Sequence, residues 1–371
     1  MSTTDSLTAS PSSSVEDQDQ KIAAEKESFK VVKVLVWDLD NTVWDGTLLE
    51  GGAGDLRPGV KEGLEILDEK GVLHSIASKN QSEPALEKLQ ELGIDHFFLY
   101  PQIHWGSKAG SVQRIAEAIN IGLDTVAFID DQAFERDEVR HSHQEVRTFD
   151  ADQVSELAGL EDFQPRFITD ESSQRRAMYQ ADIRRKEVEE DYTGPQEDFL
   201  ADLDMKFVLG AAKLEDLKRA EELTMRTNQL NTTGYTYSYD ELAELRESEE
   251  HLLLIASLDD RYGTYGKIGL ALVEKEPEVW NVKLLLMSCR VMSRGVGTIM
   301  LNHLMALANE AGVKLRAEFR HNGRNRMMLV TYKMVAGFQE IETRDDGILI
   351  LENDLSRIQP FPEYVEVVLD D

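Results

Sequence analysis

Short apolar runs alternate with amphipathic segments through residues 31–130. The runs are VVKVLVW (31–37), VLHSIAS (72–78), FFLY (97–100) and TVAFID (125–130), and segments such as VKEGLEILDEKG lie between them. Such runs are typical of buried strands, and strands that alternate with helices form parallel sheets with helices on both faces. The sequence therefore predicts an α/β domain with a parallel sheet in this part of the chain.

The second half of the chain has a different pattern. A charged stretch over 170–192, with few large apolar residues, is typical of an exposed connecting helix. After it come two strand-like runs around DDRYGTYG (259–266), a third strand, a glycine-bearing turn and a helix over 298–312, which indicate an α+β domain. A chain of 371 residues is long enough for two cores. We expect a disordered polar tail at 1–29, the α/β domain at 30–155, a helical linker at 156–200, the α+β domain at 201–360 and an acidic tail at 361–371.

Charge and cysteine content exclude several classes of protein. The net charge is -30, which disfavours general attraction to nucleic acid or to an anionic membrane. The single cysteine fits a reducing compartment, and the first residues lack the charged and apolar regions of a secretion signal. We expect a cytoplasmic enzyme without a nucleic-acid or membrane partner, in which a metal or a local basic patch holds any anionic ligand.

Polar side chains follow the predicted strands of the first domain at the point where each strand ends. They are Asp38, Asp40, Ser78, Asp130 and Asp131, with Lys108 at the start of the helix after FFLY. Because ligands bind outside the carboxyl ends of parallel strands, these groups should converge. A carboxylate nucleophile, a second carboxylate for proton transfer, Mg²⁺ and phosphate-holding groups together perform phosphoryl transfer. Each acid taken alone could instead be a solvated turn residue.

These segments resemble a known set of motifs. DLDNT, IASKN, GSKAG and IDD are similar to the four ordered motifs of the haloacid-dehalogenase (HAD) superfamily. The resemblance implies that Asp38 is the nucleophile and that Asp40 is the general acid/base. It also implies phosphate-binding or supporting roles for Thr42, Ser78 and Lys108, and a Mg²⁺ site made by Asp38, the Asp40 carbonyl, Asp130 and Asp131.

The spacing between the motifs leaves no room for a large separate cap domain. Ordinary helices and strands fill the stretches from Asp40 to Ser78 and from Ser78 to Asp130. We therefore expect a capless HAD-like Rossmannoid sheet with an open site. An open site favours a bulky or carrier-bound substrate, because the partner then completes the enclosure.

The second domain contains a strand, a glycine loop and a helix in MSCRVMSRGVGTIMLNHLM. Gly295 and Gly297 would let the backbone approach a phosphate at the helix N-terminus, although a tight turn explains them equally well. Residues 289–333 hold eight basic side chains and two acidic ones, which favours a polyanionic ligand over simple helix-end charges. The loop, with Asn325 and the segment around Tyr332, resembles GCN5-related N-acetyltransferases (GNAT). The basic charge makes Arg290 and Arg294 candidate phosphate-binding residues, and the resemblance implies ligand contacts by Gly295, Gly297 and Asn325.

The ordered chain as a whole resembles the FkbH-like bifunctional glyceryl transferase/phosphatases of polyketide pathways, which belong to HAD subfamily IIIC. The similar segments include VWDLDNTVWDGTLLE, YPQIHWGSK, FIDDQAFERDEV, RTNQLNTTGYTYS and SCRVMSRGVG. The resemblance implies transfer of a phosphoglyceryl group from 1,3-bisphosphoglycerate to the phosphopantetheine thiol of an acyl carrier protein, with removal of the phosphate. It gives Cys289 a role as covalent acyl acceptor, because a thiolate beside Arg290 can attack an acyl phosphate. A buried structural cysteine is the other interpretation.

Three other functions fit parts of the sequence. The first is a stand-alone HAD phosphatase whose GNAT-like domain only docks a partner. The second is a CoA-dependent N-acetyltransferase with an inactive first domain, against which the complete set of acidic residues and Met292, in place of the usual Gln or Arg, both argue. The third is a non-catalytic module that docks a carrier protein.

Overall fold

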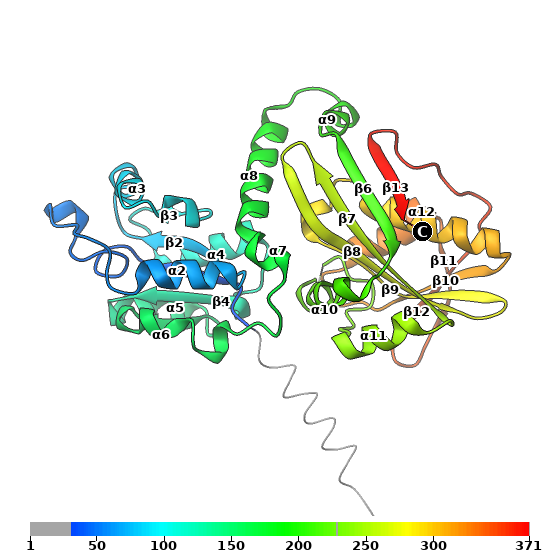
Figure 1. The fold of residues 1–371 in the computed structure, drawn as a ribbon, viewed down its shortest axis with the longest axis horizontal. Helices are drawn as coiled ribbons and strands as arrows, with labels where there is room; N and C mark the ends of the chain where they lie inside the picture. Colours follow the sequence, from blue (N-terminus) through cyan, green and yellow to red (C-terminus); the bar gives the residue numbers. More distant parts are fainter. Residues whose placement is uncertain (1–30, 228, 371) are drawn as a thin grey trace, which may run out of the picture. The chain divides into compact units, whose positions relative to one another are not determined.

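The computed structural model describes residues 31–227 and 229–370, and the chain divides into two compact units at Arg166 and Phe167 (Figure 1). The expected disordered tail at 1–29 lies outside the described residues. Residues 156–200, which we expected to link the domains, are divided between the units. Within the described ranges, no helix is both long and apolar enough to cross a membrane.

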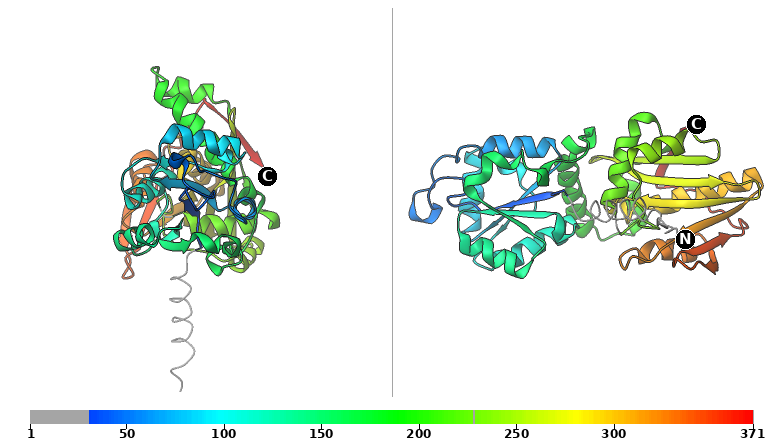
Figure 2. Two further views of the ribbon diagram at one scale, coloured as in Figure 1. Left: turned by 90° about the vertical axis from the view of Figure 1, so that its left-hand side faces the viewer. Right: turned by 90° about the horizontal axis from the view of Figure 1, so that it is seen from below.

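The first unit is built on a five-stranded sheet in the order β3-β2-β1-β4-β5, and every pair of neighbours is parallel. The strands are β1 (Val34–Trp37), β2 (Leu73–Ser78), β3 (Gln102–Ile103), β4 (Val126–Asp130) and β5 (Arg147–Asp150). The helices are α2 (Val60–Glu69), α3 (Ser82–Glu91), α4 (Lys108–Ile119), α5 (Ala133–Ser142) and α6 (Val154–Leu157). Helices cover both faces of the sheet (Figure 2), which confirms the predicted α/β class.

One predicted strand of this sheet is wrong. We expected FFLY (97–100) to form it, but Phe97 ends the 3₁₀ turn η2 (Asp95–Phe97) and Phe98 makes only an isolated bridge with His74. The strand β3 follows at Gln102–Ile103 and is only two residues long. The side chains of FFLY are apolar because they pack into the core of the unit: Phe97 and Phe98 belong to the same buried cluster as Trp37 and Ile76.

The second unit contains an eight-stranded mixed sheet in the order β11-β12-β10-β9-β8-β7-β6-β13. The strands are β6 (Met205–Ala211), β7 (His251–Asp260), β8 (Gly263–Lys275), β9 (Val279–Met287), β10 (Lys314–Phe319), β11 (Gln339–Thr343), β12 (Leu349–Asn353) and β13 (Val365–Asp370). β9 runs parallel to β10 and β6 parallel to β13, whereas the other neighbours are antiparallel. The hairpin predicted around DDRYGTYG is therefore confirmed as β7 and β8.

Helices pack on both faces of this second sheet. They are α7 (Asp170–Ser173), α8 (Arg175–Asp191), α9 (Gln196–Asp202), α10 (Leu217–Arg226), α11 (Tyr239–Glu247), α12 (Val296–Ala311) and α13 (Arg326–Val330), which continues as the π-helix η8 (Thr331–Val335). Leu304 of α12 packs with Phe207 in one core cluster. Leu223 of α10 packs with Leu253 in another, so α12 and α10 lie over opposite faces.

Two segments differ from the expected organisation. The end of the expected acidic tail forms β13, because the alternating sequence VEVVLD can pair in parallel with β6 while its first residue, Val365, stays buried. The charged helix α8 is part of the second unit, since Arg185 is fully buried and its Nε lies 2.6 Å from Oδ2 of Asp260. Charge along α8 therefore reflects buried ion pairs as well as solvent exposure.

Candidate functional site

Parallel pairing of β1 with β4 brings the two main acidic motifs together. Trp37 pairs with Ile129 in the register of these strands, and the backbone N–H of Asp38 donates to the Ile129 carbonyl at 3.0 Å. All four residues of β1 are buried apolar side chains, and Asp38 is the first polar residue after them. The next residue after Ile129 is Asp130, which therefore lies beside Asp38 at the carboxyl edge of the sheet.

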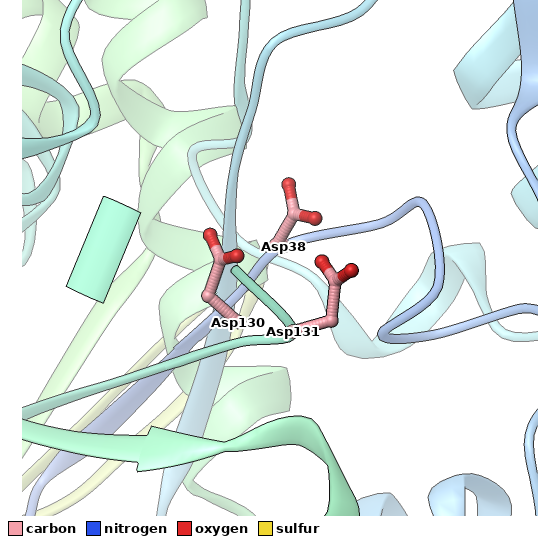
Figure 3. Close-up of side chains that lie close together, drawn as sticks. All are labelled: Asp38, Asp130 and Asp131. Carbon is pink, nitrogen blue, oxygen red and sulfur yellow. The ribbon is translucent and has the colours of Figure 1, made fainter. Parts of the chain in front are cut away.

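Three carboxylates gather at this edge. Ligand oxygens of Asp38, Asp130 and Asp131 all lie within 4.8 Å of one another (Figure 3). Asp38 is 3% exposed and Asp130 is fully buried, whereas Asp131 is half-buried. The structure therefore brings together the acidic groups that the two motifs supply.

Lys108 joins this cluster from the first residue of α4. Its Nζ lies 2.8 Å from Oδ1 of Asp38 and 2.5 Å from Oδ2 of Asp130, and the lysine is itself buried. The start of α4 is fixed by Ser107, whose side chain accepts a hydrogen bond from the Gly110 N–H. The ammonium therefore has a defined place between two carboxylates.

One ammonium does not offset the charge of three carboxylates. Burial raises the pKa of Asp38 to about 6, although the adjacent Lys108 opposes the shift. Burial also raises the pKa of Asp130 and of Asp131, again with Lys108 opposing. Keeping the carboxylates ionised in the metal-free site therefore costs free energy, and a bound cation would lower that free energy.

The donor set fits Mg²⁺. Oδ1 of Asp131 is buried and has no hydrogen-bond partner among the described residues, so it is available as a ligand. Mg²⁺ prefers carboxylate oxygens in an open site that also admits water or a phosphate oxygen. The Asp38, Asp130 and Asp131 cluster therefore fits Mg²⁺, the cofactor expected from the sequence.

Asp40 lies outside this cluster of ligand oxygens and has partners of its own. Its Oδ1 accepts hydrogen bonds from Nε1 of Trp44 at 2.8 Å and from the N–H of Leu48 at 3.0 Å. Its Oδ2 accepts one from Nδ2 of Asn80 at 3.0 Å. These three donors fix the orientation of the carboxylate, as a group that exchanges protons with a substrate requires.

Two further predicted residues have different surroundings. Oγ1 of Thr42 accepts a hydrogen bond from the N–H of Asp131 at 3.1 Å, so Thr42 connects the first motif with the last and supports the turn. Ser78 is buried at the carboxyl end of β2, between Ala77 and the loop that contains Asn80. Sequence reasoning missed Asn80 and Trp44. Asn80 stands two residues after Ser78, a spacing that could have pointed to it.

Residues 40–130, all of which the structure describes, contain no inserted domain. η1 (Leu48–Glu50) and α2 lie between Asp40 and β2, and the elements from α3 to η3 (Leu123–Thr125) lie between Ser78 and β4. Near the motifs in sequence, Trp105 is 64% exposed and Phe134 is 75% exposed. This arrangement agrees with the capless site that the spacing predicts.

The predicted residues of the second unit lie after β9. Cys289 begins the 3₁₀ turn η7 (Cys289–Val291) and is partly exposed. Nη2 of Arg290 donates to the Tyr265 carbonyl at 2.9 Å, which holds this turn against β8. Arg294 is buried and forms a 2.9 Å ion pair with Glu189 of α8. Arg294 thus has an internal partner, and its predicted ligand contact stays a prediction.

Contacts within the chain also explain why glycine occupies both positions of the loop. Gly295 has a φ of +77° at the start of α12, and a Cβ there would lie 2.5 Å from the Tyr364 hydroxyl. A Cβ on Gly297 would lie 2.9 Å from Cε of Met287. Close packing within the chain therefore explains both glycines, and the positive φ of Gly295 fits the tight-turn interpretation, while the phosphate contact stays a prediction.

Asn325 makes hydrogen bonds within the fold, and its predicted ligand contact stays a prediction. Its side chain is buried, and its Nδ2 donates to the backbone carbonyls of Asn231 at 2.9 Å and Arg320 at 2.8 Å. These bonds tie the segment before α13 to the loop after α10. The amide nitrogen is therefore used within the fold.

Ion pairs offset much of the basic charge of residues 289–333. The pairs are Arg294 with Glu189, Lys314 and Arg316 with Glu352, Arg320 with Asp346, and Lys333 with Glu340. The acidic partners come from segments outside the counted stretch. The local excess of positive charge that the sequence predicts is thus smaller in the folded unit.

The sequence was compared with protein-family models and with known proteins. No protein-family model matches the sequence. The chain is similar to magnesium-dependent phosphatase 1 of Homo sapiens, with 28% identity over 122 residues that cover 28% of this chain and 69% of the human protein.

Among solved structures, the chain is similar to the N-terminal part of the protein BF1531 from Bacteroides fragilis, which contains a phosphatase domain complexed with Mg. The identity is 28% and the TM-score 0.34, and the match covers 38% of this chain and 43% of that chain, less than half its length. A second similar structure is the ribosomal-protein-S18-alanine N-acetyltransferase from Escherichia coli, at 17% identity and a TM-score of 0.33, covering 42% of this chain and 97% of that chain.

The chain thus joins a parallel α/β sheet, whose acidic cluster fits Mg²⁺, to a unit with a mixed sheet, and it is similar in sequence to magnesium-dependent phosphatase 1.

Proposed function

We propose that the protein is a Mg²⁺-dependent phosphatase that uses Asp38 as its nucleophile, and that its substrate is a phosphoglyceryl group carried by an acyl carrier protein. The observation that carries the phosphatase part is the buried contact of Lys108 with Asp38 and Asp130 beside Asp131. The similarity to a magnesium-dependent phosphatase supports the same reaction.

The residues of the first unit divide the reaction between them. The Asp38 carboxylate attacks phosphorus, and the alcohol oxygen of the substrate leaves with a proton from Asp40. Water then attacks the aspartyl phosphate, and Asp40 takes up the proton of that water. Lys108 holds Asp38 in position and offers positive charge to the phosphate oxygens. When bound, Mg²⁺ supplies charge that offsets the repulsion between carboxylate and phosphate.

The finer part of the proposal is the identity of the donor and the acceptor. It depends on the resemblance of both domains to FkbH-like enzymes, which use 1,3-bisphosphoglycerate and an acyl carrier protein. Cys289 would accept the phosphoglyceryl group as a thioester, and the phosphopantetheine thiol would then take it over. Partial exposure of Cys289 beside Arg290 supports this role.

Intact-mass spectrometry of a holo carrier protein tests the full reaction. With enzyme, Mg²⁺ and 1,3-bisphosphoglycerate, we expect a glyceryl adduct without phosphate. D38N should leave an adduct that retains the phosphate, and C289A should give no adduct. A full yield of the dephosphorylated glyceryl adduct with D38N would contradict the phosphatase role. An adduct on the carrier protein with C289A would contradict the acyl-acceptor role.

The internal ion pairs of residues 289–333 and the buried amide of Asn325 favour a second candidate. In that case the first unit is a phosphatase and the GNAT-like unit only docks a partner. The same experiment separates the two, because a stand-alone phosphatase releases phosphate from the donor without carrier protein and forms no adduct.

A further inference from the structure

Three arginines of the second unit contact one glutamate, and a fourth, which follows Cys289, interacts with two of them. We call Arg175 of α8, Arg219 and Arg226 of α10, and Arg290 of η7 the arginine cluster. Three of its members contact Glu222 of α10, and the fourth follows Cys289 directly in the chain. Elements far apart in the sequence therefore bring positive charge to the turn that carries the cysteine.

Glu222 is a shared partner for three guanidinium groups. Its Oε1 lies 2.5 Å from Nη2 of Arg175 and 2.8 Å from Nε of Arg226, and its Oε2 lies 2.6 Å from Nη1 of Arg219. Although burial alone would raise it, the pKa of Glu222 is held well below its usual range by these arginines. One carboxylate thus faces three cations, and Arg290 adds a fourth nearby. The cluster keeps an excess of positive charge.

Donor groups of the cluster are unused within the fold. Nε of Arg175, Nε of Arg219 and Nη1 of Arg290 are buried and have no hydrogen-bond partner among the described residues. Arg175 is 8% exposed and Arg219 is 7% exposed, so more than nine-tenths of each is buried. A buried guanidinium N–H without a partner is costly, and an anionic ligand is the group that would satisfy it.

Electrostatic effects connect the cluster with Cys289. Burial lowers the pKa of Arg290, and Arg219 and Arg175 lower it further, whereas Tyr179 and Cys289 act in the opposite direction. Burial and the neighbouring Arg175 lower the pKa of Arg226 to about 9. The carbon of the Arg290 guanidinium also lies 5.9 Å from the centre of the Tyr179 ring on α8. The thiol and the unused donors thus belong to one neighbourhood.

We propose that the arginine cluster is an anion site that holds the phosphate of an acyl phosphate beside Cys289. This inference rests on the proposed function and adds the place where the leaving phosphate is bound. The Cys289 sulfur forms a bond to the acyl carbon, and the bond from that carbon to the phosphate oxygen breaks with its electron pair on the oxygen. The thiol proton ends on the departing phosphate, so an acyl phosphate and a thiol give a thioester and hydrogen phosphate.

Guanidinium groups suit this task. Each presents planar N–H donors that match two phosphate oxygens at once, and a buried site strengthens the attraction. Glu222 orients three of the arginines without saturating them. A structural explanation, in which Glu222 is the only anion the arginines ever bind, predicts that added phosphate has no effect at Cys289.

Alkylation of Cys289 tests the site directly, because the chain has a single cysteine. The full-length protein is treated with iodoacetamide at constant ionic strength, with either inorganic phosphate or chloride. We expect phosphate to slow the modification about tenfold when its concentration is about ten times its dissociation constant. Chloride should have no such effect.

Arginine variants show which residues provide the protection of Cys289 by phosphate. R290Q and R219Q should lose the protection by phosphate, whereas R316Q, which removes an arginine paired with Glu352 on another strand, should retain it. The ratio of the iodoacetate rate to the iodoacetamide rate should fall in R290Q and stay unchanged in R316Q, because only the first reagent is anionic. Thermal melting shows whether each variant is folded.

The outcomes separate this inference from the proposed function. Absence of protection in the wild type, or equal protection in R290Q and the wild type, overturns the anion site even if carrier protein is loaded. A different outcome is that D38N shows normal protection by phosphate and still releases phosphate from the carrier-bound group. This pair of results overturns the phosphatase role and leaves the anion site in place.

Discussion

Nζ of Lys108 donates a 2.8 Å hydrogen bond to Oδ1 of Asp38, and both side chains are buried. The two residues stand 70 positions apart and come from different elements, the start of α4 and the end of β1. Their contact leaves the nucleophile with a defined orientation. Burial favours the protonated, neutral form of Asp38, and the positive charge of Lys108 opposes this effect.

Removal of this lysine should destabilise the metal-free protein strongly. In K108M, Asp38 and Asp130 lose a buried partner, and such losses cost about 3–5 kcal/mol. K79M is the matched control, because Lys79 pairs with Glu135 but is about one-third exposed, and it should cost about 1 kcal/mol or less. Urea unfolding in a chelating buffer measures both. Equal effects of the two variants would contradict the account.

Binding of Mg²⁺ should stabilise the first unit through Asp131. We expect the wild type to melt at a higher temperature with Mg²⁺ than with a chelator, because binding to the folded state alone shifts the equilibrium. D131N should lose most of this gain, since Oδ1 of Asp131 is an unused buried oxygen in the cluster. A full Mg²⁺-dependent shift in D131N would place the ion elsewhere.

Stability in metal-free buffer should depend on the protonation of Asp38. Its pKa is raised from 3.8 to about 6 in the folded protein, so the folded state binds the proton more tightly than the unfolded chain does. The stability this contributes is lost as the pH rises through about 6. D38N lacks this titration and should exceed the wild type by about 3 kcal/mol above pH 7, with a gap that closes as the pH falls from 6 towards 4. A constant gap between pH 5 and 8 would disprove the shift.

Asn80 should act as a positioning residue for Asp40. In N80A the Asp40 carboxylate loses its 3.0 Å contact with Nδ2, and we expect kcat to fall about tenfold while KM changes little, as for a group that supports proton transfer. Q81A is the control, because Gln81 is exposed and makes no side-chain cap of α3. Steady-state kinetics with p-nitrophenyl phosphate distinguish them. Unchanged kcat in N80A would remove Asn80 from the site.

Sequence reasoning predicted the parts of the site that lie at strand ends. The convergence of Asp38 with Asp130 follows from parallel pairing of neighbouring strands, and that pairing can be inferred from alternating apolar runs. Contacts that depend on the path of a loop could not be inferred in this way. The hydrogen bond from Trp44 to Asp40 is an example, because it needs the turn after β1 to fold back.

In the second unit, a count along the chain does not show which charges are paired. Basic residues of 289–333 were expected to form an anion site, and the fold pairs two of them internally, Arg294 with Glu189 and Arg316 with Glu352. The partners are 105 and 36 positions away, so only the fold reveals them. The same folding places Arg175 and Arg219 near Arg290, and no local pattern in the sequence joins those three.

The most direct test of the central claim is to trap the phosphoryl group on the enzyme. The protein is mixed with Mg²⁺ and p-nitrophenyl phosphate, quenched in acid and mapped by peptide mass spectrometry. We expect a phosphoryl adduct on the Asp38 side chain, more of it in D40N because its hydrolysis is slowed, and none in D38N. An adduct on another residue, or phosphate release by D38N at the wild-type rate, would contradict the account.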